Sequence, residues 1–384
     1  MVKQADFAVE QYMDKYETGI KFNLGETCCH SMTIQEVSNL ARVGASDSLV
    51  SGIINSRMTY GHIRGSPELK SIISEQIYEG TGLTQDNIII TNGAIGANFL
   101  TFYTIVDKED HIVVVDPSYQ QLSSVPEMFG GNVELLKLKF EDKYLPDLKQ
   151  LRETVTKNKT KLVVINNPHN PTGVVWGNDI LEEIVDICRE NDCYIFCDEV
   201  YRPLYHSVEK APSSILSFGY EKAISTSSVS KAFSFAGLRL GWIATNDSKL
   251  RERFFSKRDY NMISISLIDD KIATFILTHH KKILERNYQL CKDNLDTIQK
   301  FIDLSNGKLE WVRPQGGATC FIKVNVKGSK STMEIGSELA EIHSVLVVPG
   351  EVFNHPGFIR VGFGNSKKEI EEGFPIILKY LDSL

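Results

Sequence analysis

The stretch LVVINNPHNPTG, residues 162–173, decides the fold. It opens with the apolar run Leu162–Asn166, which has the length and character of a strand covered on both faces. The turn residues that follow place the amide of Asn170 at the C-terminal end of that strand. Ligands of open α/β sheets bind at such ends. By itself, the segment could equally be an ordinary turn built from Pro168, Pro171 and Gly173.

Short apolar runs of the same kind alternate with helical patterns through the middle of the chain. The helical patterns are Ile95–Val106, Leu145–Thr156 and Asp179–Asn191. The alternation predicts an α/β fold, a three-layer arrangement with a mainly parallel sheet between helices. The other expected strands are Ile88–Thr91, Ile112–Asp116, Val133–Leu138, Tyr194–Asp198, Ala223–Ser227 and Gly241–Ala244.

The pattern changes after Asp247, which is a plausible helix cap. Residues Leu267–Ile302 are typical of one or two long helices, and Lys367–Tyr380 of a closing helix. We therefore predict a large α/β domain over residues 46–275. A second, smaller α+β domain would combine residues 1–45 with 276–384. Its expected strands are Gly317–Val324, Ser344–Val348 and Phe358–Phe363.

Composition excludes several classes of function. The chain has 384 residues, 42% of them hydrophobic and 24% charged, with a net charge of -7 and a pI near 5.8. An acidic chain argues against a nucleic-acid partner. Neither a signal peptide in Met1–Glu17 nor a membrane span is expected. The seven cysteines lack the spacing of a zinc site, which favours a reducing cytoplasm and no metal.

Two further segments carry side chains that chemistry could use. Asp198, followed by Tyr201, ends an apolar strand and is either a helix cap or a buried charge with a cationic partner. Lys231 follows Ser228 and comes eight residues before Arg239. A lysine after serines is usually a solvated loop residue. Its apolar neighbours nevertheless favour burial and a lowered pKa.

In this order and at these spacings, the three segments resemble the class I/II aminotransferases, the aspartate-aminotransferase-like fold type I of pyridoxal-phosphate enzymes. The resemblance runs from Gly25 to Arg360. It implies that Lys231 holds pyridoxal 5'-phosphate as a Schiff base and shuttles a proton. Asp198 would keep the pyridine nitrogen protonated, which makes the ring a better electron sink. Tyr201 and Asn170 would donate hydrogen bonds to the ring's 3-oxygen.

The resemblance also implies a phosphate site. Backbone N–H groups of Ala94 and Ile95, at the start of an expected helix, would face the phosphate. Ser228 would add a hydroxyl and Arg239 a positive charge. Tyr119 resembles the aromatic residue that stacks on the cofactor ring. The alternatives without a cofactor are that Gly93 merely allows a tight turn before the helix and that Tyr119 packs in the hydrophobic core.

Substrate and partner contacts follow from the same resemblance. Arg360 matches the arginine that binds the substrate α-carboxylate, and Gly25 and Asn170 would lie near it. Tyr60 resembles a tyrosine that reaches the partner's phosphate, which predicts a homodimer, although a surface turn is the alternative. Nothing fixes the substrate side chain. Three cations could bind a distal carboxylate but cannot be placed from sequence: Arg64, Arg258 and Arg313.

These observations predict an aminotransferase that moves nitrogen from an amino acid to a 2-oxo acid. One alternative keeps the cofactor but gives elimination, replacement or cyclisation. Segments 257–260, 314–317 and 347–353 look somewhat like capreomycidine synthase, which cyclises a hydroxylated arginine. Glu199 and Tyr201 keep the ordinary aminotransferase pattern and favour transamination. The other alternative, a pyridoxal-phosphate-sensing regulator, would need a basic helix-turn-helix extension that is not found before Gly25.

Overall fold

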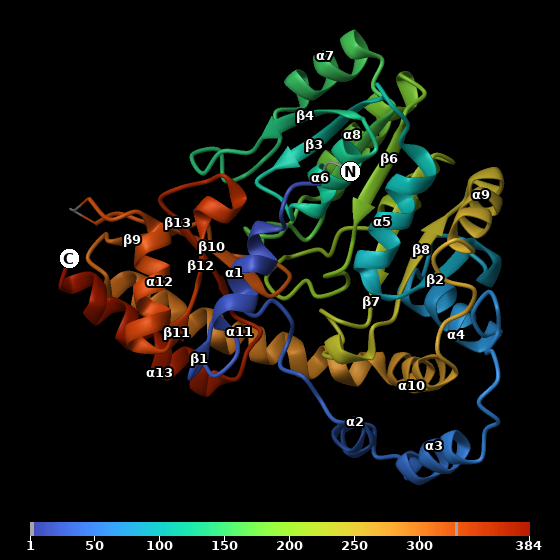
Figure 1. Ribbon diagram of the computed structural model, residues 1–384, viewed down its shortest axis with the longest axis horizontal. Helices are drawn as coiled ribbons and strands as arrows, with labels where there is room; N and C mark the ends of the chain where they lie inside the picture. Colours follow the sequence, from blue (N-terminus) through green and yellow to red (C-terminus); the bar gives the residue numbers. More distant parts are fainter. Residues whose placement is uncertain (1–3, 327–328) are drawn as a thin grey trace.

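A computed structural model describes residues 4–326 and 329–384 (Figure 1). A large central sheet lies beside a smaller sheet built from C-terminal residues, and the long helix α11 (His280–Leu304) runs below both. The N-terminal helix α1 (Ala8–Tyr16) lies between the two sheets (Figure 1). Among the described residues, no helix combines the length and the apolar character that crossing a membrane requires.

The central sheet has seven strands in the order β2-β8-β7-β6-β5-β3-β4. Strand β8 runs antiparallel to both of its neighbours, and the other pairs are parallel, so the expected mainly parallel sheet is confirmed. Each strand that was expected for this central sheet is found within one residue of its expected ends. The strands are β2 (Ile88–Thr91), β3 (His111–Asp116), β4 (Asn132–Lys137), β5 (Leu162–Asn166), β6 (Tyr194–Asp198), β7 (Ala223–Ser228) and β8 (Gly241–Thr245).

Both faces of this sheet are buried, which explains the unbroken apolar runs. Val113 and Val115 belong to one hydrophobic core, whereas Ile112 and Val114 belong to a second core on the opposite face. Successive strand residues point to opposite faces, so helices cover the sheet on each side. The helices of this region are α4 (Pro67–Ile72), α5 (Gly93–Ile105), α6 (Gln121–Met128), α7 (Leu148–Asn158), α8 (Asn178–Glu190) and α9 (Ser248–Arg258).

The smaller sheet has four strands in the order β12-β13-β10-β9, and a parallel pair, β1 with β11, lies beside it. These strands are β1 (Phe22–Asn23), β9 (Leu309–Trp311), β10 (Thr319–Val324), β11 (Val345–Leu346), β12 (Val348–Pro349) and β13 (Phe358–Gly362). The prediction of one strand over Ser344–Val348 is wrong, because the chain changes sheets at Val347. Strand β1 shows that N-terminal residues join this region.

The helices outside the central layers differ most from expectation. Residues 267–302 form two helices, which separate at His279. Helices α1, α2, α3 and α12 were not anticipated from the pattern, and neither were α4 and α6 beside the central sheet, because several are short and α12 interrupts a run of strands. The predicted domain boundaries remain predictions. The remaining helices are α2 (Ile34–Ala41), α3 (Ala45–Ile54), α10 (Leu267–Thr278), α12 (Thr332–His343) and α13 (Lys367–Asp382).

Candidate active site

A cavity of about 390 Å³ opens beside the C-terminal ends of β5, β6 and β7. Its size lies in the range of small-molecule sites. The cavity is lined by every predicted site residue except Tyr60, namely Gly25, Ala94, Ile95, Tyr119, Asn170, Asp198, Tyr201, Ser228, Lys231, Arg239 and Arg360. Residues far apart in the sequence therefore meet in one place.

Asp198, the last residue of β6, is a buried carboxylate with two hydrogen-bond donors. Its Oδ2 accepts from Asn98 Nδ2 over 2.9 Å, and its Oδ1 accepts from the backbone N–H of Val200 over 3.0 Å. Burial raises the pKa of Asp198 to about 6, although the hydrogen bonds from Asn98 and Val200 oppose the rise. The group is ionised at neutral pH, and a cation placed against it would relieve the burial cost.

Lys231 follows β7, and its amine points toward the N-terminal segment. Its Nζ donates to Thr27 Oγ1 over 2.6 Å and lies 3.4 Å from Cys28 Sγ. Burial lowers the pKa of Lys231, but the combined effect of Cys28, Tyr201 and Glu26 raises it by more, so the net shift is upward. The expectation of a lowered pKa is therefore wrong, because the amine has acidic as well as apolar neighbours.

Glu26 is the negative charge that faces Lys231 at neutral pH. Burial raises the pKa of the Cys28 thiol to about 12, so that thiol stays protonated. Burial also raises the pKa of Glu26, but Lys231 and hydrogen bonds lower it more, to about 2. Glu26 Oε1 accepts from the N–H groups of Thr27 and Cys28 over 2.6 and 2.9 Å. The carboxylate is thus ionised and fixed in place.

The start of helix α5 forms an anion site at one end of the cavity. A Cβ added to Gly241 would lie 2.4 Å from the carbonyl carbon of Gly93, so β8 packs directly against the first turn of α5. A Cβ on Gly93 would lie 3.0 Å from Arg239 Nη2. Ser228 is fully buried and lines the same cavity. Helix N–H groups, a hydroxyl and a guanidinium together suit a phosphate.

Unpaired polar atoms indicate that a ligand belongs beside β5 and β6. Asn166 fixes the turn, since its Oδ1 accepts from Asn170 N over 2.6 Å and its Nδ2 donates to Asp198 O over 2.7 Å. Asn170 Oδ1 and the hydroxyl of Tyr201 are buried without a hydrogen-bond partner among the described residues. Buried polar atoms of this kind are normally paired, so these two point to a missing polar group.

Arg360, in β13, supplies a buried cation to the wall of the cavity. Its side chain is 3% exposed, its Nη2 donates to Gly25 O over 3.0 Å, and its Nε has no partner among the described residues. Burial lowers the pKa of Arg360, but a guanidinium stays charged at any physiological pH. A substrate carboxylate could accept hydrogen bonds from this guanidinium and form an ion pair with it.

The residues present fit pyridoxal phosphate. The anion site at α5 suits its phosphate, Asp198 its ring nitrogen, and Asn170 with Tyr201 its ring oxygen, while Lys231 is an amine that can meet its aldehyde. Metal-binding clusters of His, Cys, Asp and Glu are absent from the described residues.

Tyr60 lies outside this cavity, with 72% of its surface exposed, so its role remains a prediction. Several lining residues were not found by sequence reasoning, namely Glu10, Glu17, Glu26, Thr27, Cys28 and Asn98. A signal existed only for Asn98, which stands four residues after Ala94 and so shares its helix face. The others belong to segments whose position depends on tertiary packing.

This fold and this set of side chains define a fold type I pyridoxal-phosphate enzyme. The family model of aminotransferase class I and II matches residues 19–375. The chain therefore belongs to the class I and II aminotransferases, and the predicted reaction type and cofactor are confirmed: it is a pyridoxal-phosphate-dependent aminotransferase.

Individual relatives agree with this assignment. A pyridoxal-phosphate-dependent aminotransferase from Streptococcus suis has the same fold with a TM-score of 0.93 and 33% identity, covering 99% of this chain and 98% of that one. Aspartate aminotransferase from Thermotoga maritima is 28% identical over 84% of each chain. Capreomycidine synthase from Streptomyces vinaceus is 27% identical over 83% of this chain and 79% of its own.

Proposed function

We propose that this aminotransferase holds its cofactor on Lys231 and moves an amino group from an amino acid to a 2-oxo acid within the cavity described above. The observation that carries the proposal is the placement of Lys231 and Asp198 on the walls of one cavity that has groups for two anions. The start of α5 suits a phosphate, and Arg360 suits a carboxylate. The amine and the acid line the same cavity.

Each side chain has a defined task in this proposal. Pyridoxal phosphate, when bound, supplies an electron sink for the electron pair left on the substrate Cα. Asp198 holds the proton of the ring nitrogen, and Tyr201 with Asn170 donates to the ring oxygen. Arg360 orients the substrate through its α-carboxylate. Lys231 Nζ carries the proton that leaves Cα, and Tyr119 covers the ring face.

We also propose a homodimer in which Tyr60 reaches the partner's site. The segment around Tyr60 exposes several apolar side chains in the single chain, which supports a protein contact there. Val50 and Ile54 lie on α3, at the edge of the molecule in Figure 1, and Met58 and Ile63 flank the tyrosine. A two-fold interface would cover these residues on both chains at once.

A reducing compartment, the cytoplasm, is the proposed location. All seven cysteines are free and buried. Buried thiols of this kind serve as small apolar side chains.

The attachment can be tested by reducing the holoenzyme with borohydride and mapping the labelled peptide. The proposal expects the label on the peptide that contains Lys231, and a label elsewhere would contradict it. A screen of amino acids for conversion of the cofactor to its pyridoxamine form then tests transamination. The relative named capreomycidine synthase makes a cyclised or eliminated product the alternative, and ammonia release without a 2-oxo acid would reveal elimination.

A further inference from the structure

Two carboxylates, Glu10 of helix α1 and Glu17 at the C-cap of this helix, line the cavity that Arg360 also lines. Glu10 and Glu17 are both lining residues, and so is Met13 between them. Spacings of three and four residues place all three on one face of the helix. Arg360 lines the same cavity; burial lowers its pKa, and the charge of Glu10 opposes this shift, so Glu10 and the carboxylate anchor are within electrostatic range of each other.

Hydrogen bonds and the packing of two aromatic rings hold helix α1 and the residue before it against the cavity. The N–H of Ala8 donates to Gln120 Oε1 over 2.8 Å, and Gln120 Nε2 donates to Asp6 O over 2.8 Å. The ring of Phe7 packs 5.0 Å from that of Tyr119. The Tyr119 hydroxyl donates to Glu10 Oε1 over 3.0 Å and so orients this carboxylate beside the cofactor position.

The cations of the cavity have partners or tasks other than pairing with these two carboxylates. Arg239 suits the phosphate, Arg360 suits a carboxylate, and Lys231 faces Glu26. Neither Glu10 nor Glu17 forms an ion pair within the described residues 4–326 and 329–384. Burial raises the pKa of Glu17, and so do the charges of Asp14, Glu26 and Glu10. A positive group placed between the two carboxylates would relieve this repulsion.

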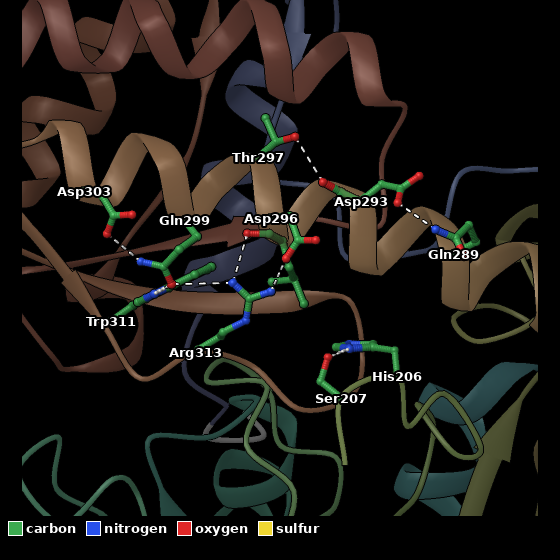
Figure 2. Close-up of polar contacts among 11 residues, drawn as sticks. His206, Ser207, Gln289, Asp293, Asp296, Thr297, Gln299, Asp303, Trp311 and Arg313 are labelled. Atoms are coloured by element: carbon green, nitrogen blue, oxygen red, sulfur yellow. Dashed lines mark hydrogen bonds and ion pairs between the residues drawn. The ribbon is translucent and has the colours of Figure 1, made fainter. Parts of the chain in front are cut away.

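The arginines that could have bound a distal carboxylate are placed elsewhere. Arg313 donates over 2.6 Å to Asp296 of helix α11 (Figure 2). Arg64 pairs with Glu252 over 3.5 Å. Arg258 is buried and donates to backbone oxygens of residues 63 and 263. Among the described residues, none of the three lines the cavity.

We propose that the amino-donor substrate is an L-amino acid whose side chain carries a positive charge, with its cationic group between Glu10 and Glu17. This inference rests on the proposed function, since Arg360 must hold the α-carboxylate for the side chain to extend along α1. The unpaired Nε of Arg360, which is buried in this same cavity, supports the position of the α-carboxylate from which that side chain would extend. A side chain with a carboxylate would meet two like charges there.

The wild-type holoenzyme gives the first test. Its cofactor is watched for conversion to the pyridoxamine form with L-arginine and with L-citrulline, which has nearly the same shape but no charge. L-Lysine and L-norleucine form a second pair, and L-aspartate is included. We expect each cationic donor to exceed its neutral counterpart by roughly tenfold or more in apparent second-order rate constant. Equal rates within a pair, or a preference for L-aspartate, would overturn the inference.

Substitutions of Glu10 and Glu17 test whether these carboxylates recognise the cationic side chain. Glu10→Gln and Glu17→Gln should each reduce the arginine-to-citrulline ratio by roughly three- to tenfold, because each removes one charge. Asp14→Asn is the matched control, since Asp14 is an acid of the same helix that acts on Glu17 through its charge but does not line the cavity. Its ratio should stay within about twofold of wild type. A ratio unchanged in both glutamine variants, or an equal loss in Asp14→Asn, contradicts the assignment.

A binding measurement separates recognition from turnover. Calorimetry with the Lys231→Ala protein should show tighter binding of L-arginine than of L-citrulline, with the difference reduced by Glu17→Gln. Equal binding of the two ligands counts against the inference. Failure of the proposed function looks different, because no amino acid would then convert the cofactor and borohydride would not label Lys231. Conversion by neutral or acidic donors alone leaves the aminotransferase intact and removes only the substrate class.

Discussion

Asn98 Nδ2 donates a hydrogen bond of 2.9 Å to Asp198 Oδ2, and this bond joins the second turn of helix α5 to the end of strand β6. Asn98 is held in turn, since its Oδ1 accepts from the Thr226 hydroxyl over 2.7 Å and its Nδ2 lies 3.2 Å from Gln121 Oε1. Both Asn98 and Asp198 are buried. The carboxylate proposed to hold the ring nitrogen is therefore positioned by an amide whose own orientation is fixed.

The first prediction concerns Asn98→Ala. Loss of the donor should raise the pKa of Asp198 above its present value of about 6, so that less of the ionised form is available at neutral pH. We expect the affinity for pyridoxal phosphate to fall roughly tenfold at pH 7 and less at pH 9. Fluorescence titration of the cofactor-free protein measures both values.

The control for this measurement is Thr101→Val on the same helix. Thr101 is buried, and its hydroxyl donates only to Ala97 O within the helix. This variant should bind the cofactor normally. An equal loss of affinity at both pH values in Asn98→Ala would mean that the amide acts through packing and not through the charge of Asp198.

A second prediction is a pH-dependent stability of the cofactor-free protein. The pKa of Asp198 is raised from 3.8 to about 6, so the native state binds its proton more tightly than the unfolded chain does. The stabilisation is complete below the unfolded value and is lost as pH rises through about 6. The free energy of unfolding should then fall by up to ~3 kcal/mol from this group.

Urea unfolding at several pH values tests this expectation. Other groups titrate in the same range, so the comparison is between wild type and Asp198→Asn. The fall between about pH 4 and pH 7 should be smaller in the variant by the contribution of Asp198. If the free energy of unfolding depended on pH in the same way in both proteins, the pKa of Asp198 would not be raised in the native state. Adding pyridoxal phosphate should stabilise the wild type more than the variant.

A third prediction concerns the anion site. In Gly241→Ala the new Cβ would lie 2.4 Å from Gly93 C and 2.6 Å from Ala94 N, so the first turn of α5 must move. We expect a loss of about 1–3 kcal/mol in stability and weaker binding of inorganic phosphate. Gly237→Ala is the matched control, because nothing lies within 4 Å of its Cβ. Normal phosphate affinity in Gly241→Ala would place the anion elsewhere.

The central sheet could be predicted because its signal is local. Strands such as Val113–Val115 are buried on both faces, and an unbroken apolar run reports this burial directly. Asp198 and Lys231 come at the C-terminal ends of two parallel strands, β6 and β7, which meet at one edge of the sheet. Much of the site could therefore be expected once those strands were recognised. The parallel strand ends and the resemblance together located the lining residues that the structure places around the cavity.

What the sequence could not provide depends on contacts between distant segments. Glu10 and Glu17 look like ordinary solvent-facing acids of an amphipathic helix, and only the docking of α1 on Tyr119 turns them toward the cavity. The direction of the Lys231 pKa shift was also wrong, because Glu26 lies 205 positions away in the chain. Helix α12 was not predicted, since its neighbours on both sides are short strands.

The last prediction tests the shared site by mixing two proteins that are defective for different reasons. Lys231→Ala should lose roughly 10²–10⁴-fold in turnover and the long-wavelength absorbance of the attached cofactor, because it lacks the amine. Tyr60→Ala should bind the cofactor more weakly if its hydroxyl reaches the partner's phosphate, so the assay uses a cofactor concentration that loads the wild type but not this variant.

When the two variants are unfolded together and refolded, half of the dimers should be mixed. One site of each mixed dimer then carries both substitutions and the other carries neither. Activity should return to about a quarter of the wild-type value, since one site in four is intact. Recovery requires that Tyr60 and Lys231 of a single site come from different chains. If both residues served the site of their own chain, every site in the mixture would be defective and no activity would return.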